Sequence, residues 1–89
     1  MERVPVKCRV DMGIDYFRPM RIKYEDEAGA HIINIDRIIT KDKRQIIPSK
    51  YIAPELEYTF KCETIQEDMQ RPLTLTFNNQ TCIWYMYTN

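Results

Sequence analysis

Apolar and polar residues alternate with a period of two along most of this chain. The clearest run covers residues 4–12, where every second residue is valine, cysteine or methionine and most residues between them are charged. A period of two places successive side chains on opposite faces of a β-strand, whereas an amphipathic helix has a period of 3.6. The chain is therefore predicted to be mainly β, with strands that bury one face.

Polar turns divide this pattern into six predicted strands. We expect them at residues 4–12, 18–25, 30–40, 55–62, 72–77 and 81–87. Short strands at a spacing of about 8–12 residues, joined by short links, are typical of antiparallel barrels and sandwiches. The predicted fold is a six-stranded antiparallel meander curled into a small barrel or half-barrel. It forms one domain over residues 1–89.

The third predicted strand interrupts the alternation. Ile33 and Ile35 share one phase, and Ile38 takes the opposite one. A β-bulge at Asp36-Arg37 would return the three isoleucines to one inner face, and a strand buried on both faces is the alternative. Asp36 and Arg37 are also singled out as charged residues within an isoleucine-rich strand, without an assigned role.

Two segments are predicted to be connections. Residues 41–50 are polar and basic apart from Ile46-Ile47, and we expect a loop there, with at most a short strand. In residues 63–71, Thr64 and Glu67 have the spacing of a helix capping box, but a helix this short is marginal. We expect a hairpin loop there, with at most one helical turn.

The apolar phases of the later strands provide the predicted core. It contains Leu56, Tyr58, Phe60, Leu73, Leu75, Phe77 and Trp84. The three cysteines, Cys8, Cys62 and Cys82, are odd in number and form no CxxC pair, which predicts free, buried thiols in a reducing compartment. No apolar stretch approaches the length of a membrane span or of a signal peptide. A cytoplasmic protein without membrane contact is therefore predicted.

Residues 18–38, RPMRIKYEDEAGAHIINIDRI, and the late Trp84-Tyr85-Met86 resemble a group of small uncharacterised bacterial all-β proteins. The recurring pattern of that group is R-P-x-[RK]-[IF]-x-[WY]-E, then [IV]-D-R-[IV], and a late W-[FY]. This chain departs from the group by its longer segment at residues 63–71. The resemblance implies a small bacterial β domain and, since the group has no assigned activity, no mechanism.

The chain lacks the residues that most enzymes need. Two glycines, Gly13 and Gly29, are too few for a phosphate-binding loop, and there is no HExxH or GxSxG motif. His31 is the single histidine and lies at a predicted turn, away from the core phases of the cysteines, which disfavours a catalytic dyad or a zinc site. We predict a non-enzymatic chain without cofactor or metal. A small-ligand-binding or enzymatic β domain is the third hypothesis.

The last predicted strand is aromatic on both faces. Trp84 takes one face, and Tyr85 and Tyr87 take the other. One face fills the core, and the other needs cover from the 41–50 loop, a second subunit or a partner. Tyr and Trp commonly anchor interfaces. The leading hypothesis is a protein-interaction module that binds a partner, or itself as a homodimer, through Trp84, Tyr85 and Tyr87.

The second predicted strand supports another hypothesis. It carries Arg18, Arg21 and Lys23 beside Tyr24, and small barrels hold single-stranded nucleic acid on basic faces that include aromatic residues. Two observations oppose it. The 13 basic and 13 acidic residues give a formal net charge of zero, and basic residues also simply solvate an exposed sheet face.

Overall fold

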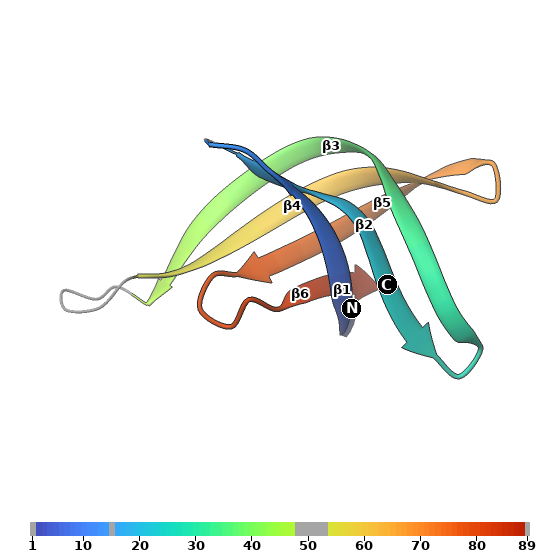
Figure 1. Ribbon diagram of the computed structural model, residues 1–89, viewed down its shortest axis with the longest axis horizontal. Coiled ribbons are helices and arrows are strands. Elements are labelled where there is room, and N and C mark those ends of the chain that lie inside the picture. The colour runs from blue at the N-terminus through green and yellow to red at the C-terminus, as the bar shows by residue number, and fades with distance from the viewer. Residues whose placement is uncertain (1, 15, 48–53, 89) are drawn as a thin grey trace.

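A computed structural model of the chain describes residues 2–14, 16–47 and 54–88. The strands are β1 (Glu2–Met12), β2 (Phe17–Asp26), β3 (Gly29–Ile47), β4 (Glu55–Gln66), β5 (Met69–Asn78) and β6 (Trp84–Thr88). Each strand pairs antiparallel with the next, and β6 returns to β1, so the six strands close into a barrel (Figure 1). The described residues contain no helix. The predicted mainly-β, six-stranded meander is confirmed in its closed form.

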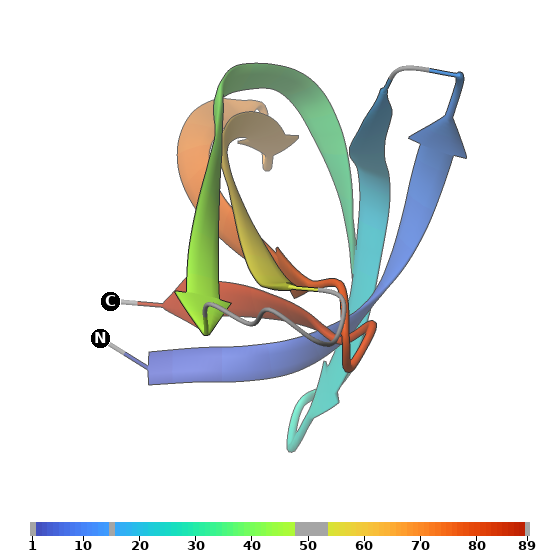
Figure 2. The same ribbon diagram turned by 90° about the vertical axis from the view of Figure 1, so that its left-hand side faces the viewer.

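Two long strands make this closure possible. Residues 2–6 of β1 pair with β6, and residues 7–12 pair with β2. In the same way, residues 29–34 of β3 pair with β2, and residues 35–47 pair with β4. Both strands therefore pass from one half of the sheet to the other, and the two chain ends lie side by side (Figures 1 and 2).

The irregular spacing of the isoleucines is resolved by a bulge in β3. The register against β4 shifts between Ile35 and Arg37, which leaves Asp36 as the extra residue. Ile33 is buried, and Ile35 and Ile38 pack against the same core. The predicted bulge at Asp36-Arg37 is confirmed, because one additional residue restores the inward phase.

The prediction of a loop at residues 41–50 is wrong for residues 41–47, which continue β3. They pair with β4 from Lys41 opposite Phe60 to Ile47 opposite Glu55. This pairing satisfies backbone groups that a polar sequence would otherwise expose to water. Arg44 Nη2 also lies 3.0 Å from Glu57 Oε1 across the ladder. Residues 48–50 of the predicted loop lie outside the described residues.

The hairpin predicted at residues 63–71 is confirmed, but its loop is much shorter than expected. β4 and β5 extend into this segment and leave a turn at Glu67-Asp68, with φ angles of 53° and 60°. Two successive positive φ angles are typical of the tight turn that matches the twist of a β-hairpin. The capping-box pattern forms no helix there: Thr64 is fully buried, and its hydroxyl donates to the Arg71 carbonyl at 3.3 Å.

The core occupies the barrel interior. Its buried members are Ile22, Ile33, Phe60, Cys62, Leu73, Leu75, Trp84 and Met86. Of the other predicted core residues, Tyr58 and Phe77 are half-buried against this cluster, and Leu56 is half-buried outside it. Phe17 joins the two halves of the barrel, because its ring meets those of Tyr58 and Phe60 edge-on at centroid distances of 4.8 and 5.6 Å.

The last strand begins at Trp84 rather than at residue 81, which changes the environment of one cysteine. Cys82 has a φ of 58°, and its N–H donates to the Asn78 carbonyl at 2.8 Å, so it belongs to the turn. The prediction that Cys82 is buried is wrong, because a left-handed residue interrupts the alternation just before β6. Cys62 is buried and Cys8 half-buried, and all three are free thiols.

We predict that the three cysteines of the native protein react with thiol reagents at different rates. Burial raises the pKa of Cys8 to about 12, with a further contribution from Cys62, and raises that of Cys62 to about 11. Their thiolates are therefore scarce at about pH 8, whereas Cys82 is exposed. Labelling with dithionitrobenzoate should modify Cys82 rapidly and the other two only in denaturant. Cys82→Ser should remove the rapid phase, and rapid labelling of that variant would contradict the prediction.

Candidate nucleic-acid interface

Four cations face one another across β1 and β2. Lys7 lies opposite Lys23, and Arg9 lies opposite Arg21. All four residues are exposed, and none takes part in the ion pairs found among the described residues. Like charges directly opposite each other destabilise a sheet. This group, which we call the cation ladder, therefore suits an anionic ligand better than it suits the isolated fold.

The other two residues of the predicted nucleic-acid set flank the cation ladder. Arg18 is exposed and lies opposite Asp11, farther along the same pair of strands. Tyr24 is half-buried, on the opposite phase from Lys23, and stacks on His31 with a centroid distance of 4.9 Å. His31 in turn forms a 2.8 Å contact with Asp26, and this hydrogen bond holds the pKa of that carboxyl below its usual value.

Two hollows border the cation ladder. One, of about 360 Å³, lies where β1 leaves β2 to join β6, and Lys7, Lys23 and Tyr24 help to line it. The other, of about 420 Å³, includes Arg9 and Arg21 in its wall. Arg21 Nε donates to Asn34 Oδ1 at 2.9 Å, which orients this guanidinium. Glu25 also lines the first hollow and Asp11 the second, so each hollow offers two cations and one carboxylate, a net positive charge, to an anionic group such as a phosphate.

The aromatic residues of β6 do not form one surface. Trp84 is buried, and its ring packs 5.5 Å from that of Phe60. Tyr85 is half-buried beneath the Arg3 guanidinium, 4.1 Å from the ring centroid. Tyr87 is also half-buried, opposite Arg3 on β1. A partner would therefore meet Tyr85 and Tyr87 but not Trp84, and their role in partner binding stays a prediction.

The outward face of Tyr85 has cover within the chain itself. A hollow of about 270 Å³ is lined by Tyr85, Arg3 and Ile46 together with polar residues of β4 and β5. Ile46 belongs to the 41–50 segment, one of the three alternatives considered as cover for this face. It reaches this face from the extended end of β3 rather than from a loop.

Lys7 and Arg9 were not among the predicted nucleic-acid residues, although the sequence contains a signal for them. Both lie on the polar phase of the first strand, and the link to the second strand is short. A short link between antiparallel strands sets neighbouring outward phases side by side. The short link therefore predicts the two cations beside Arg21 and Lys23, where the structure places them.

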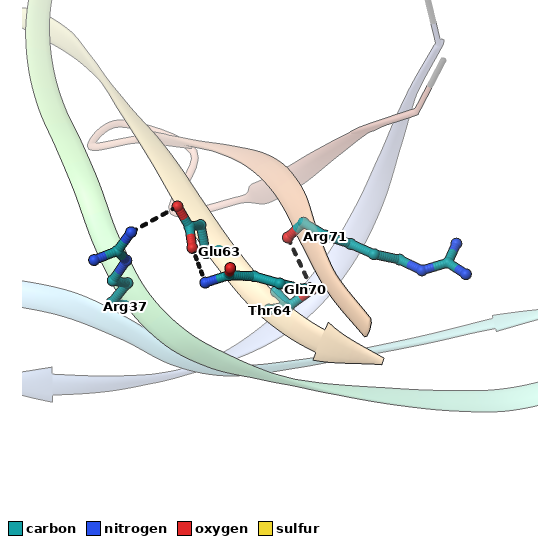
Figure 3. A network of polar contacts seen from close by, with 5 residues as sticks. All are labelled: Arg37, Glu63, Thr64, Gln70 and Arg71. Carbon is teal, nitrogen blue, oxygen red and sulfur yellow. Dashed lines mark hydrogen bonds and ion pairs between the residues drawn. The ribbon is translucent and has the colours of Figure 1, made fainter. Parts of the chain in front are cut away.

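Arg37 belongs to a different part of the barrel (Figure 3), and Asp36 precedes it in the β3 bulge. Arg37 Nη2 donates to Glu63 Oε1 at 2.9 Å, and Gln70 donates to the other oxygen of the same carboxylate. The bond from Arg37 lowers the pKa of Glu63, and the same contact raises the pKa of Arg37. This network braces β3, β4 and β5 beside the bulge, and the exposed Asp36 adds a nearby negative charge.

Searches of the described part of the chain found no group of three or more metal-ligating side chains and no helix able to span a membrane. Comparison with protein-family models, with curated proteins and with solved structures gave no match. The resemblance to small bacterial β proteins therefore stays a prediction from the sequence.

Proposed function

We propose that this chain is a non-enzymatic binding module, and that it holds the phosphates of single-stranded nucleic acid on the cation ladder. The observation that carries the proposal is the placement of like charges on opposite positions of two paired strands, Lys7 with Lys23 and Arg9 with Arg21. Like charges that cost stability in the free protein and become favourable beside an anion are expected of a binding surface.

The formal net charge of zero does not support this proposal, but the distribution of the charges along the chain does. Residues 1–24 hold six of the 13 basic residues and three of the 13 acidic ones, a formal net charge of +3, so the remainder carries −3. A neutral protein can therefore present a basic face, and phosphate contacts depend on the local field. A single strand suits this face better than a duplex because its flexible backbone can follow the curved β1–β2 pair.

A protein partner on β6 is the alternative, with less support from the contacts. Tyr85 lies beneath Arg3, and Trp84 is inside the barrel. The three free thiols support a reducing compartment such as the cytoplasm, and the sequence resemblance supports a bacterial source.

The test is the salt dependence of binding to a fluorescein-labelled oligothymidylate of about 15 nucleotides, followed by anisotropy. If about four phosphates are neutralised, the Kd should rise roughly 50-fold between about 50 and 200 mM salt, from a slope of about −0.7 per phosphate for single strands. An uncharged morpholino of the same sequence should not bind. Absence of binding at the lower salt concentration, or binding that salt does not weaken, would overturn the proposal.

A further inference from the structure

Aromatic rings and lysines line a hollow formed by the β1–β2 hairpin, β3 and β4. We call it the barrel mouth, a hollow of about 520 Å³ beside the tip of the β1–β2 hairpin. Its lining comprises Met12, Gly13, Ile14, Tyr16, Phe17, Lys41, Lys43 and Tyr58. A smaller hollow of about 230 Å³ shares three of these residues and reaches Phe77 and Trp84. Among the described residues that line the two hollows there is no carboxylate.

Tyr16 is held in place at this mouth while half of its surface remains free. It is 53% exposed, yet its ring lies so close to Gly13 that a Cβ built on Gly13 would be 2.2 Å from its Cε1 atom. The Gly13 N–H also donates to the Tyr16 carbonyl at 2.9 Å. An exposed ring that is already positioned loses little freedom when a flat ligand stacks on it.

Two lysines face into the mouth. Lys41 and Lys43 pair with Phe60 and Tyr58, so they share the inward phase of β4. Lys41 Nζ lies 4.3 Å from the Phe17 ring centroid and donates to the Phe17 carbonyl at 3.4 Å. Lys43 forms no ion pair with any described residue. Inward-pointing lysines also prevent the sheet edges of two molecules from pairing. That role does not require an aromatic ring held in position beside the lysines.

We infer that the barrel mouth binds one unstacked nucleobase of the strand, with the base on Tyr16 and a neighbouring phosphate at Lys43. The inference rests on the proposed function and identifies what the ligand offers besides phosphate. A base supplies a flat apolar face for Tyr16, and its phosphate supplies the anion that Lys43 favours. The mouth lies at one end of the β1–β2 pair, and the same pair carries the cation ladder. One short oligonucleotide can therefore reach both.

The experiment compares two labelled oligonucleotides with identical phosphates, an oligothymidylate and the same strand with abasic sugars throughout. The wild-type protein should bind the abasic strand about 5- to 100-fold more weakly, because base–aromatic stacking is lost. Tyr16→Ser should remove most of this preference and leave the dependence on salt unchanged. Tyr16→Phe, which keeps the ring, should retain the preference. Gly13→Ala should weaken it without a change of charge, because the added methyl group must displace the Tyr16 ring.

The possible failures are distinguishable. Equal, salt-dependent binding of both strands by the wild-type protein would overturn the base site and leave the cation ladder as the phosphate site. A wild-type protein that binds neither strand would overturn both proposals. A base preference that Tyr16→Ser leaves intact would also overturn the site. If sedimentation shows a dimer that Tyr16→Ser dissociates, the exposed Met12, Ile14 and Tyr16 form a self-association surface, and the base site is wrong.

Discussion

Lys7→Glu combined with Arg9→Glu should weaken oligonucleotide binding at least about 100-fold and make the protein more stable. A hydrogen bond to a charged group contributes about 1.5–3 kcal/mol, and each 1.4 kcal/mol is a factor of ten in Kd. Two reversed charges also repel the phosphates. Stability should rise by roughly 0.2–1 kcal/mol per pair, because each glutamate then faces Lys23 or Arg21 instead of a like charge.

Anisotropy and urea unfolding of the same variant measure the two effects. Lys61→Glu with Arg71→Glu is the control for binding, since these two residues lie on β4 and β5, their reversal changes the net charge by the same amount, and it should reduce binding far less. It is not a control for stability, because Arg71 pairs with Glu67 at 3.9 Å. A variant that loses stability along with affinity would show that these cations serve the fold, against the proposal. Unchanged binding would place the phosphate site elsewhere.

Phe60→Ala should cost about 3–5 kcal/mol of folding free energy, the range for truncating a buried phenylalanine. Phe60 is fully buried, and its ring contacts those of Phe17 and Trp84. A domain has only roughly 0.05–0.15 kcal/mol of stability per residue, so a large part of the total would be lost. Urea unfolding followed by the fluorescence of Trp84 measures the change.

Ile65→Ala provides the control for this prediction. Ile65 lies on the same strand but is 58% exposed, so its truncation should change stability by no more than about 0.5 kcal/mol. Equal losses in the two variants would mean that Phe60 does not lie at the centre of the core. Circular dichroism gives a second probe, which excludes a purely local change in fluorescence.

The inward faces of the strands were predictable because every second side chain of a strand points inward, so a buried face requires apolar residues with a period of two. That rule identified Phe60, Leu75 and Trp84, and the misplaced Ile38 was enough to locate the bulge. It failed where backbone pairing outweighs side-chain character. The polar residues 41–47 look like a loop, but their hydrogen bonds to β4 keep them extended.

Positive φ angles account for the remaining errors. Glu67 and Asp68 form a tight turn, and Cys82 ends another, although none of them is glycine or asparagine. Aspartate tolerates this region better than most side chains, but Glu67 and Cys82 adopt it only where the surrounding structure compensates, so their residue types gave little warning. These three residues determine where β4, β5 and β6 begin or end.

Two of the four residues of the cation ladder were predicted from the sequence. Arg21 and Lys23 were identified as a basic strand face, but the ladder needs Lys7 and Arg9, which depend on the register between two strands. The barrel mouth was not anticipated, since it combines the β1–β2 tip with lysines from a segment expected to be a loop. Positions that come together through pairing cannot be read from one strand at a time.

Pairing of the first strand with the last also affects how the chain acquires its shape during synthesis. Glu2 lies opposite Thr88, and Val6 opposite Trp84, so these pairings join residues that are far apart in the sequence. The hairpins from β1 to β5 involve local contacts and can form as the nascent chain leaves the ribosome. The seam between β1 and β6 cannot form before β6 has been synthesised, and pairing between segments so far apart in the sequence is expected to slow its closure.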